Sequence, residues 1–353
     1  MDHTSMTYHE QVNVDNVLRL REVLKTLPGF AKDYFRAIEP TTSTRTRISY
    51  AYDIRIFFQF LVSENPLFRD KDITTLTVDV LDQLQALDIE EYQEYLKVYQ
   101  DSDHKTVTNG ERGLKRKMSA LRSFYAYYFK REMIHTNPTV LVDMPKLHEK
   151  EIIRLDADET AQLLDYIEHC GDSLTGQKKV YYEKTKVRDL AIVTLLLGTG
   201  IRVSECVGLD VNDIDFKNNG IRVVRKGGSE MMVYFGDEVE AALRNYLEAR
   251  KAITPIAGHE NALFYSTQRR RIGVQAVENM VKKYAREVTT TKKITPHKLR
   301  STYGTSLYKE TGDIYLVADV LGHKDVNTTR KHYAAMDDDR RRKAASAVKL
   351  REA

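Results

Sequence analysis

The chain has 353 residues, of which 42% are hydrophobic and 30% are charged, and 55 Lys and Arg stand against 51 Asp and Glu for a net charge of +4. This apolar fraction excludes a wholly disordered chain, and the length predicts two domains. No stretch approaches the ~18 consecutive apolar residues of a membrane span, and the first residues do not resemble a secretory signal. The two cysteines, Cys170 and Cys206, exclude a disulfide scaffold or a multi-cysteine zinc site. We therefore expect a protein of the reducing cytoplasm.

The small net charge hides an uneven distribution. Residues 251–300 carry 11 basic against 3 acidic residues, and residues 101–150 carry 10 against 6. Residues 51–100 carry 4 basic against 10 acidic, and residues 151–250 carry 13 against 18. Two basic blocks separated by acidic ones favour a polyanion held between two parts of the molecule. Ordinary solvated helix faces are the alternative that charge alone leaves open.

The first part of the chain predicts helices. We expect helix over residues 17–27, a break at Pro40, and a new helix capped by Ser43 or Thr44. Apolar residues then recur every four positions from Ile48 to Phe60, which is typical of an amphipathic helix. Residues 81–96 predict one or two further helices.

Residues 106–129 predict another helix with one apolar face. Its basic residues lie mostly elsewhere around the helix, where they could contact phosphates or simply face solvent. They are Lys115, Arg116, Lys117 and Arg122. A polar, extended stretch follows, and we expect residues 147–154 to link two domains.

The second region mixes helices with short strands. A helix with acidic residues in its first turn is expected from residue 156, and an apolar helix over 188–198 stops at Gly198-Thr199-Gly200. Helix resumes over 201–209. The runs 221–224 and 231–235, with Gly227-Gly228 between them, predict a β-hairpin, and the remainder is mostly helical.

Two basic residues stand at turns of this region. Arg202 follows the glycine turn, in the expected first turn of the next helix, where a guanidinium adds donors to the free N–H groups of the helix. Lys226 lies at the hairpin turn, where an ammonium can protonate a leaving alkoxide. Taken singly, each is more often a solvated surface residue.

Three more features follow towards the C-terminus. Thr295 and Pro296 predict a helix start, and His297 and Arg300 lie three apart, on one helix face. His323 follows a helix end at Gly322. Tyr333 is one of 21 tyrosines, so it has little weight alone.

Together the six residues form a chemical set. Arg202 and Arg300 can bind a phosphate, His297 can act as a base, Lys226 as an acid, His323 as a further donor and Tyr333 as an oxygen nucleophile. This set suits attack on a phosphodiester without a metal or another cofactor.

The order and spacing of these strings resemble the tyrosine recombinase family, and most of all the Xer-type recombinases of the single-enzyme streptococcal and lactococcal kind. The matching strings are Gly200-Ile201-Arg202-Val203-Ser204-Glu205, Arg225-Lys226-Gly227-Gly228, His297-Lys298-Leu299-Arg300, Leu321-Gly322-His323 and Tyr333. Many Xer proteins place the nucleophile nine residues after the equivalent of His323. That position here is His332, so we expect Tyr333, at ten, to be the nucleophile.

The resemblance implies a mainly α fold with a small β-sheet. It divides the chain into an N-terminal helical extension (1–40), an all-helical, SAM-like core-binding domain (41–146), the linker (147–154) and a mixed α/β catalytic domain with a tail helix (155–353). DNA contacts are then expected from basic residues of both domains. These are Lys115, Arg116, Lys117, Arg122, Arg225, Lys292 and Lys293.

The resemblance also implies the activity. Tyr333 would cut duplex DNA through a 3′-phosphotyrosyl bond at a site of inverted half-sites, in a homotetramer that exchanges C-terminal tails across two duplexes. Chromosome dimer resolution, possible control by a DNA translocase, and integration or excision of a mobile element all stay open. A type IB topoisomerase, or a DNA-binding protein that has lost catalysis, are further alternatives.

Overall fold

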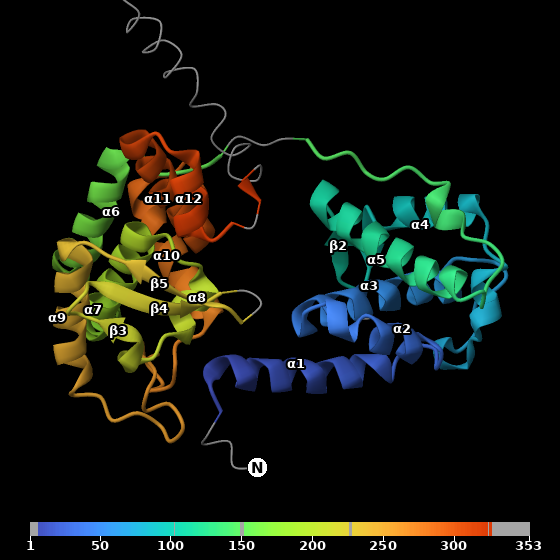
Figure 1. Cartoon of the computed structure of the whole chain (residues 1–353), viewed down its shortest axis with the longest axis horizontal. Coiled ribbons are helices and arrows are strands. Elements are labelled where there is room, and N and C mark those ends of the chain that lie inside the picture. Colours follow the sequence, from blue (N-terminus) through green and yellow to red (C-terminus); the bar gives the residue numbers. More distant parts are fainter. Residues whose placement is uncertain (1–5, 102, 149–151, 226–227, 324, 327–353) are drawn as a thin grey trace, which may run out of the picture. The chain divides into compact units, whose positions relative to one another are not determined.

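The computed structural model describes residues 6–101, 103–148, 152–225, 228–323 and 325–326 (Figure 1). The chain forms two compact units, Met1–Lys150 and Glu151–Ala353. The division between them falls within residues 147–154, where the sequence analysis expected a linker. The predicted tail helix lies outside the described residues.

Unit 1 is helical apart from one β-ribbon. Its helices are α1 (Tyr8–Leu24), α2 (Ala31–Ala37), α3 (Thr44–Ser63), α4 (Ala86–Tyr95) and α5 (Glu111–Lys130), with single 3-10 turns η2 (Glu39–Thr41), η3 (Ile73–Thr75), η4 (Val78–Leu81) and η5 (Pro138–Val140). Strands β1 (Val98–Gln100) and β2 (Thr106–Thr108) pair antiparallel. The prediction of Ser43 as a helix cap is confirmed, since its hydroxyl accepts from the backbone N–H of Thr46.

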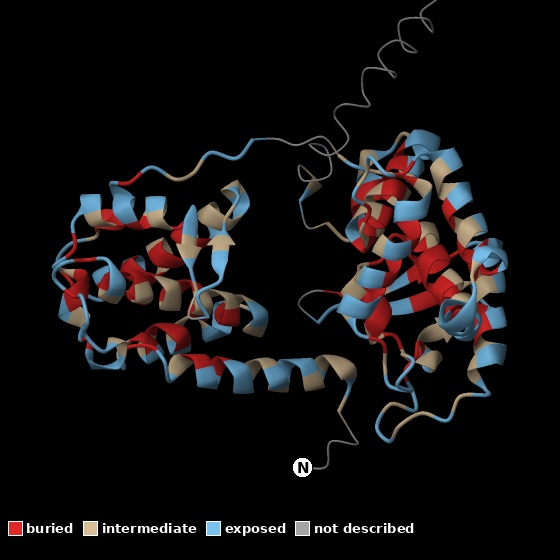
Figure 2. Ribbon diagram, turned by 180° about the vertical axis from the view of Figure 1, so that it is seen from behind, coloured by how far each residue is buried: buried red, intermediate tan, exposed pale blue. Residues whose placement is uncertain are grey.

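One aromatic core holds unit 1 together. Phe57 and Phe58 of α3, Tyr92 of α4 and Phe124 of α5 are fully buried and meet edge to face. Helices α1 and α2 also bury residues in this core. Figure 2 colours the buried residues red. Helices α1 and α2 therefore pack onto the unit's core, whereas the sequence analysis treated 1–40 as an extension.

The helix predicted over residues 106–129 begins later than expected. Thr106-Val107-Thr108 is a β-branched run with polar side chains on one face, and it pairs with β1 as strand β2. The helix starts at Glu111, after Gly110 at its N-cap. Local pairing thus overrides the helical pattern at this end.

Unit 2 packs helices around one long central helix, α7 (Gly176–Thr199), which contacts α6, α9 and α11 and buries residues 191–196. Its other elements are α6 (Ala157–His169), η6 (Cys170–Ser173), α8 (Val203–Gly208), η7 (Val211–Asp213), β3 (Ile214–Asp215), β4 (Gly220–Val224), β5 (Glu230–Tyr234), α9 (Asp237–Arg250), α10 (Val274–Val288), α11 (Pro296–Thr311) and α12 (Ile314–Leu321).

The predicted hairpin is confirmed, because β4 pairs antiparallel with β5 from Gly220 opposite Tyr234 to Val224 opposite Glu230. A third short strand, β3, which was not predicted, extends this sheet beside β4. Within the described part of the chain, no helix combines the length and apolar character that a membrane crossing requires.

Candidate active site

The turn between α7 and α8 is built around Gly200. Its φ of 63° is left-handed, and its N–H donates to the carbonyl of Leu196 at 3.1 Å, which ends α7 as predicted. A Cβ at this position would lie 2.3 Å from the ring of Tyr303. Glycine is therefore required here on two grounds, backbone conformation and space.

This turn places Arg202 at the N-cap of α8, one position earlier than the predicted first turn. The backbone N–H of Arg202 donates to Glu205 Oε2 at 2.7 Å, and its Nη1 donates to Glu205 Oε1, also at 2.7 Å. Glu205 is buried, whereas the Arg202 side chain keeps about a third of its surface exposed. The carboxylate therefore fixes the guanidinium at a partly open position.

Arg225 reaches the same carboxylate from the end of β4. Its Nη1 lies 3.4 Å from Glu205 Oε2 and 3.2 Å from the carbonyl oxygen of Leu321, and its Nη2 donates to the carbonyl of Val320 at 2.9 Å. The side chain is buried, and this burial lowers the pKa of the guanidinium. The sequence analysis expected Arg225 to contact DNA, whereas here its donors turn inward onto protein carbonyls.

Arg300 arrives from α11, whose predicted start at Thr295 and Pro296 is confirmed. It is also buried, and its Nη1 donates to the carbonyl of Gly200 at 2.6 Å. Its Nη2 donates to the carbonyl of Leu321, the same oxygen that Arg225 contacts. Arg300 thus joins the α7 turn to the end of α12.

The end of α12 is the common centre of these contacts. Gly322 has a left-handed φ of 60°, and a Cβ there would lie 2.9 Å from the Arg225 guanidinium carbon. Its carbonyl accepts from Arg202 Nη2 at 3.3 Å, and the next residue, His323, donates its N–H to the carbonyl of Ala318. His323 therefore follows directly on Leu321 and Gly322, whose carbonyls accept hydrogen bonds from the three arginines.

We call Arg202, Arg225 and Arg300 the arginine cluster. Arg202 and Arg225 pair with one carboxylate, Glu205, while Arg300 donates to backbone carbonyls, so three guanidinium groups share one carboxylate and the cluster carries an excess of positive charge. Three carbonyls at the end of α12 accept hydrogen bonds from it, as cations at a helix C-terminus are expected to donate. The arrangement suits an anion placed against it, such as a phosphate.

Of the other predicted catalytic residues, the structure describes His297 but not Lys226 or Tyr333. His297, the second residue of α11, is exposed, whereas Arg300 on the same helix is buried. Lys226 and Tyr333 lie outside the described residues. Across the residues that the structure describes, no three or more His, Cys, Asp or Glu side chains gather as a metal site would need.

The predicted DNA contacts on α5 divide into inner and outer residues. Lys117, where a phosphate contact was expected, is buried: its Nζ donates to Asn109 Oδ1 at 2.9 Å and lies 3.9 Å from the buried carboxylate of Asp53. Arg116 is exposed, yet it pairs with the same Asp53. Arg122 donates to two backbone carbonyls, those of Thr139 and Val142, in the segment that follows α5.

Three predicted contacts remain at or near the surface. Lys115 is half-buried on α5, and Lys293 is exposed in the loop before α11. Its neighbour Lys292 pairs with Glu159 at the start of α6, so part of its charge is already compensated.

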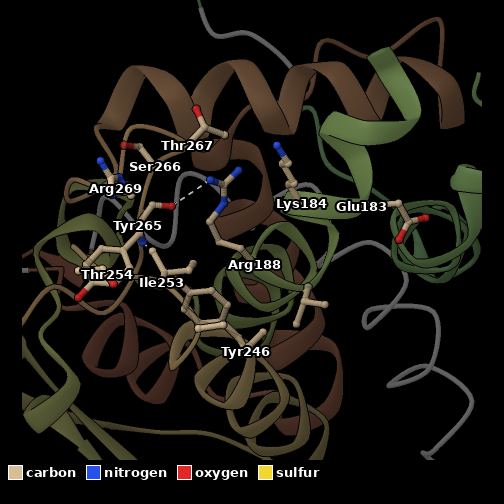
Figure 3. Close-up of a pocket in the computed structure, with 13 residues that line it drawn as sticks. Glu183, Lys184, Arg188, Tyr246, Ile253, Thr254, Tyr265, Ser266, Thr267 and Arg269 are labelled. Atoms are coloured by element: carbon tan, nitrogen blue, oxygen red, sulfur yellow. Dashed lines mark hydrogen bonds between the residues drawn. The ribbon is translucent and has the colours of Figure 1, made fainter. Parts of the chain in front are cut away.

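The described cavities lie away from the arginine cluster. One of about 480 Å³ is lined by residues of α7 and α9 and by the segment 265–269, and Figure 3 shows Arg188 in its wall donating to the carbonyl of Tyr265. None of its lining residues belongs to the predicted site. The candidate site thus lies outside this cavity.

Sequence reasoning missed the part that Glu205 plays. Glu205 stood in a matching string, but no role was given to it. The signal was present, because a residue followed three positions later by Glu at a helix start is the spacing of a capping box, and Arg202 and Glu205 form one.

Comparison with known proteins decides the family. The phage integrase family matches residues 153–340, more than half of the chain and nearly all of unit 2. This chain belongs to the phage integrase family. Its members of the tyrosine recombinase type cleave and rejoin DNA, and this chain is a tyrosine recombinase.

Similarity extends over both units. The chain is 32% identical to tyrosine recombinase XerC of Caldanaerobacter subterraneus subsp. tengcongensis over 93% of its own length and 89% of the relative. It is 29% identical to tyrosine recombinase XerS of Streptococcus uberis, over 92% of its length and 96% of that relative.

A solved structure shows the same fold. The crystal structure of the XerH site-specific recombinase bound to palindromic difH substrate matches 86% of this recombinase, and 79% of its own chain is covered, with a TM-score of 0.61 and 18% identity. The predicted fold class, mainly α with a small β-sheet, is confirmed.

Proposed function

We propose that this recombinase exchanges strands at one defined DNA site and resolves chromosome dimers, as a Xer-type enzyme. The observation that carries the proposal is the arginine cluster, whose excess positive charge stands beside His323 at the end of α12. Similarity to relatives named XerC and XerS along both units supports the Xer assignment over a mobile-element integrase.

In the proposed mechanism the phenolate of Tyr333 attacks the scissile phosphorus. A 3′-phosphotyrosyl bond forms, and the bond to the 5′-oxygen breaks. The ordinary pKa of tyrosine, near ~10, calls for a base, and we assign this role to His297. Lys226 supplies the proton that the leaving 5′-oxygen takes up.

The charge that builds on the phosphate is stabilised by side chains. We assign Arg202 and Arg300 to its non-bridging oxygens and His323 to a further hydrogen bond. The covalent bond conserves the phosphodiester energy, so attack by the 5′-hydroxyl of the partner strand rejoins the DNA. This proposed route draws on no cofactor or metal.

We propose that unit 1 is the core-binding domain and unit 2 the catalytic domain on double-stranded DNA with inverted half-sites. Four protomers would act on two duplexes in the cytoplasm, each passing its C-terminal tail to a neighbour. A DNA translocase would be a further partner.

Deleting residues 340–353 should preserve binding to one half-site but reduce strand exchange. Unchanged strand exchange would contradict the proposed passing of the tail between protomers.

A selection experiment tests the defined site. The full-length protein is incubated with random duplexes, the bound sequences are recovered, and two copies of the enriched site are placed on one supercoiled plasmid. The proposal predicts an inverted repeat and recombinant circles of discrete size. Relaxation of the plasmid at many sites without recombinants would indicate a topoisomerase and contradict the proposal.

The host chromosome separates the two recombinase roles. An enriched site that occurs once, in the chromosome of a strain without the mobile element, supports dimer resolution. A site found at the ends of a mobile element would contradict dimer resolution in favour of integration.

A further inference from the structure

Arg225 has an environment unlike that of a residue at a hairpin end. Residues next to a β-turn are usually solvated, yet this guanidinium is 8% exposed and enters the interior of unit 2. It follows β4 directly, and its backbone N–H donates to the carbonyl of Ser229 at 2.7 Å. The side chain therefore extends inward from the base of the hairpin.

The guanidinium joins three parts of the chain. It contacts Glu205 of α8 at 3.4 Å and the carbonyls of Val320 and Leu321 at the end of α12 at 2.9 and 3.2 Å. Its own backbone belongs to the hairpin. One planar group thus fixes the distances between the hairpin, α8 and the end of α12.

We propose that Arg225 is a positioning residue for strand cleavage: it holds Glu205 against Arg202 and holds the end of α12 so that His323 faces the same phosphate. It touches neither DNA nor the reacting atoms. The inference rests on the proposed roles of Arg202 and His323, and it goes beyond them by assigning a separate residue to their alignment.

Burial of this group is a poor means of stabilising the fold. Burying a guanidinium is costly unless it is fully paired, and Arg225 Nε is buried without a hydrogen-bond partner. Glu205 is shared with Arg202, so the carboxylate compensates only part of the charge. A buried apolar side chain would often serve stability as well, which favours alignment as the role of the arginine.

The end of α12 is shaped to receive this side chain. A Cβ at Gly322 would come within 2.9 Å of the guanidinium carbon, so only glycine leaves room for it. Without Arg225, the carbonyl of Val320 loses its guanidinium donor and that of Leu321 keeps Arg300 alone. Displacement of a catalytic group by about 1 Å can cost on the order of 100-fold in rate.

The test compares Arg225→Met, Arg225→Lys and wild type in full-length protein on a nicked suicide duplex. Binding, thermal midpoint and the single-turnover rate of adduct formation at saturating DNA are measured separately. Arg188→Met is the matched control. Arg188 is likewise buried in unit 2, paired with the buried carboxylate of Asp189 and bonded to a backbone carbonyl, but it stands apart from the arginine cluster.

The inference predicts that Arg225→Met cleaves roughly 100-fold more slowly than wild type, with DNA affinity within about 3-fold. Arg188→Met should keep the wild-type rate per folded molecule even where its midpoint falls further. Arg225→Lys, whose single ammonium cannot span Glu205 and both carbonyls, should be intermediate. If Arg225→Met does not fold, the test is the cleavage rate of Arg225→Lys, provided that its thermal midpoint equals that of wild type.

Equal cleavage rates for Arg225→Met and Arg188→Met, or a wild-type rate for Arg225→Lys, would overturn the inference while the proposed function stands. A loss of DNA affinity in step with the rate would instead make Arg225 a DNA contact and also overturn it. A wild-type protein that binds its site and forms no adduct contradicts the proposed function itself.

Discussion

The arginines of the cluster differ in exposure, and this difference separates their chemistry. Arg202 keeps 34% of its side chain exposed, whereas Arg225 and Arg300 are almost fully enclosed. The guanidinium of Arg202 is held from one side by Glu205 and the carbonyl of Gly322. Arg202 is therefore the residue of the cluster best placed to meet a phosphate from solvent.

Replacing Arg202 with lysine should abolish most cleavage. A lysine keeps the charge but cannot bond Glu205, the Gly322 carbonyl and a phosphate with one fork, so we expect a fall of at least about 100-fold in adduct formation. The measurement is the single-turnover rate on a nicked suicide duplex. Arg222→Lys, at the exposed position of β4 and paired with Asp213, is the control and should cleave normally. Wild-type cleavage by Arg202→Lys would contradict the assignment of Arg202 to the phosphate oxygens.

Asp53 is a buried carboxylate of unit 1, with 2% of its surface exposed. Burial raises its pKa to about 6, although Arg116 and Lys117 lie against it and favour the charged form. Burial likewise lowers the pKa of Lys117. Both shifts have the same cause, so desolvation outweighs the attraction between the charges here.

This raised pKa predicts how stability depends on pH. Unfolded Asp has a pKa near ~3.9, so between about pH 4 and 6 the folded state binds more protons, and stability falls as pH rises through this window. Asp53→Asn should lack this fall. The free energy of unfolding by urea, measured at pH 4.5 and 7, should therefore change in wild type relative to the variant by on the order of 2 kcal/mol. Parallel pH profiles of the two proteins would contradict it.

At the scale of elements, the ends of helices assemble the site. The end of α7 supplies the Gly200 carbonyl, the start of α8 supplies Arg202, and the end of α12 supplies the carbonyls of residues 320–322. Both helix ends require a left-handed glycine. The relative orientation of α7, α8 and α12 is therefore set at two glycines.

Gly200→Ala should damage both stability and cleavage. The left-handed backbone and the clash with Tyr303 together should cost about 2 kcal/mol or more, measured by urea unfolding. Gly29→Ala is the control, since a Cβ there meets nothing within 4 Å and the position is not left-handed. A Gly200→Ala protein as stable as the control would mean that the turn relaxes without disturbing the site.

The sequence predicted the elements whose signals are local. The hairpin, the Ser43 cap, the glycine turn before Arg202 and the start of α11 all follow from residues close in the chain. How deeply a charged side chain is buried depends instead on partners that are distant in the sequence. Lys117 and Arg225 look like surface cations in the sequence. Lys117 is buried against Asp53, 64 residues earlier, and Arg225 against the end of α12, about 95 residues later.

At the scale of the molecule, each unit contains one basic block. Residues 101–150 belong to unit 1 and residues 251–300 to unit 2, while acidic residues dominate 51–100 and 151–250. A net charge of +4 alone would not indicate a DNA-binding protein. Attraction of DNA depends on the local excess in each block, since distant charges are screened beyond about 10 Å at 0.1 M salt.

Binding to a cognate duplex should therefore weaken steeply with salt. If the two blocks together neutralise about 6–10 phosphates, affinity should fall by roughly 10³–10⁵ between 50 and 200 mM salt, because condensed counterions are released on binding. The dissociation constant measured across this range checks the slope. An affinity that does not change with salt would contradict a role for the basic blocks.

The central claim is that this recombinase cuts DNA through Tyr333. The most direct measurement mixes full-length protein with a nicked suicide duplex carrying its selected site and looks for a covalent protein–DNA species after denaturation. We predict that wild type forms a 3′-linked adduct, whereas Tyr333→Phe binds the duplex with unchanged affinity and forms none, because phenylalanine lacks the nucleophilic oxygen. A normal adduct from Tyr333→Phe would contradict the account.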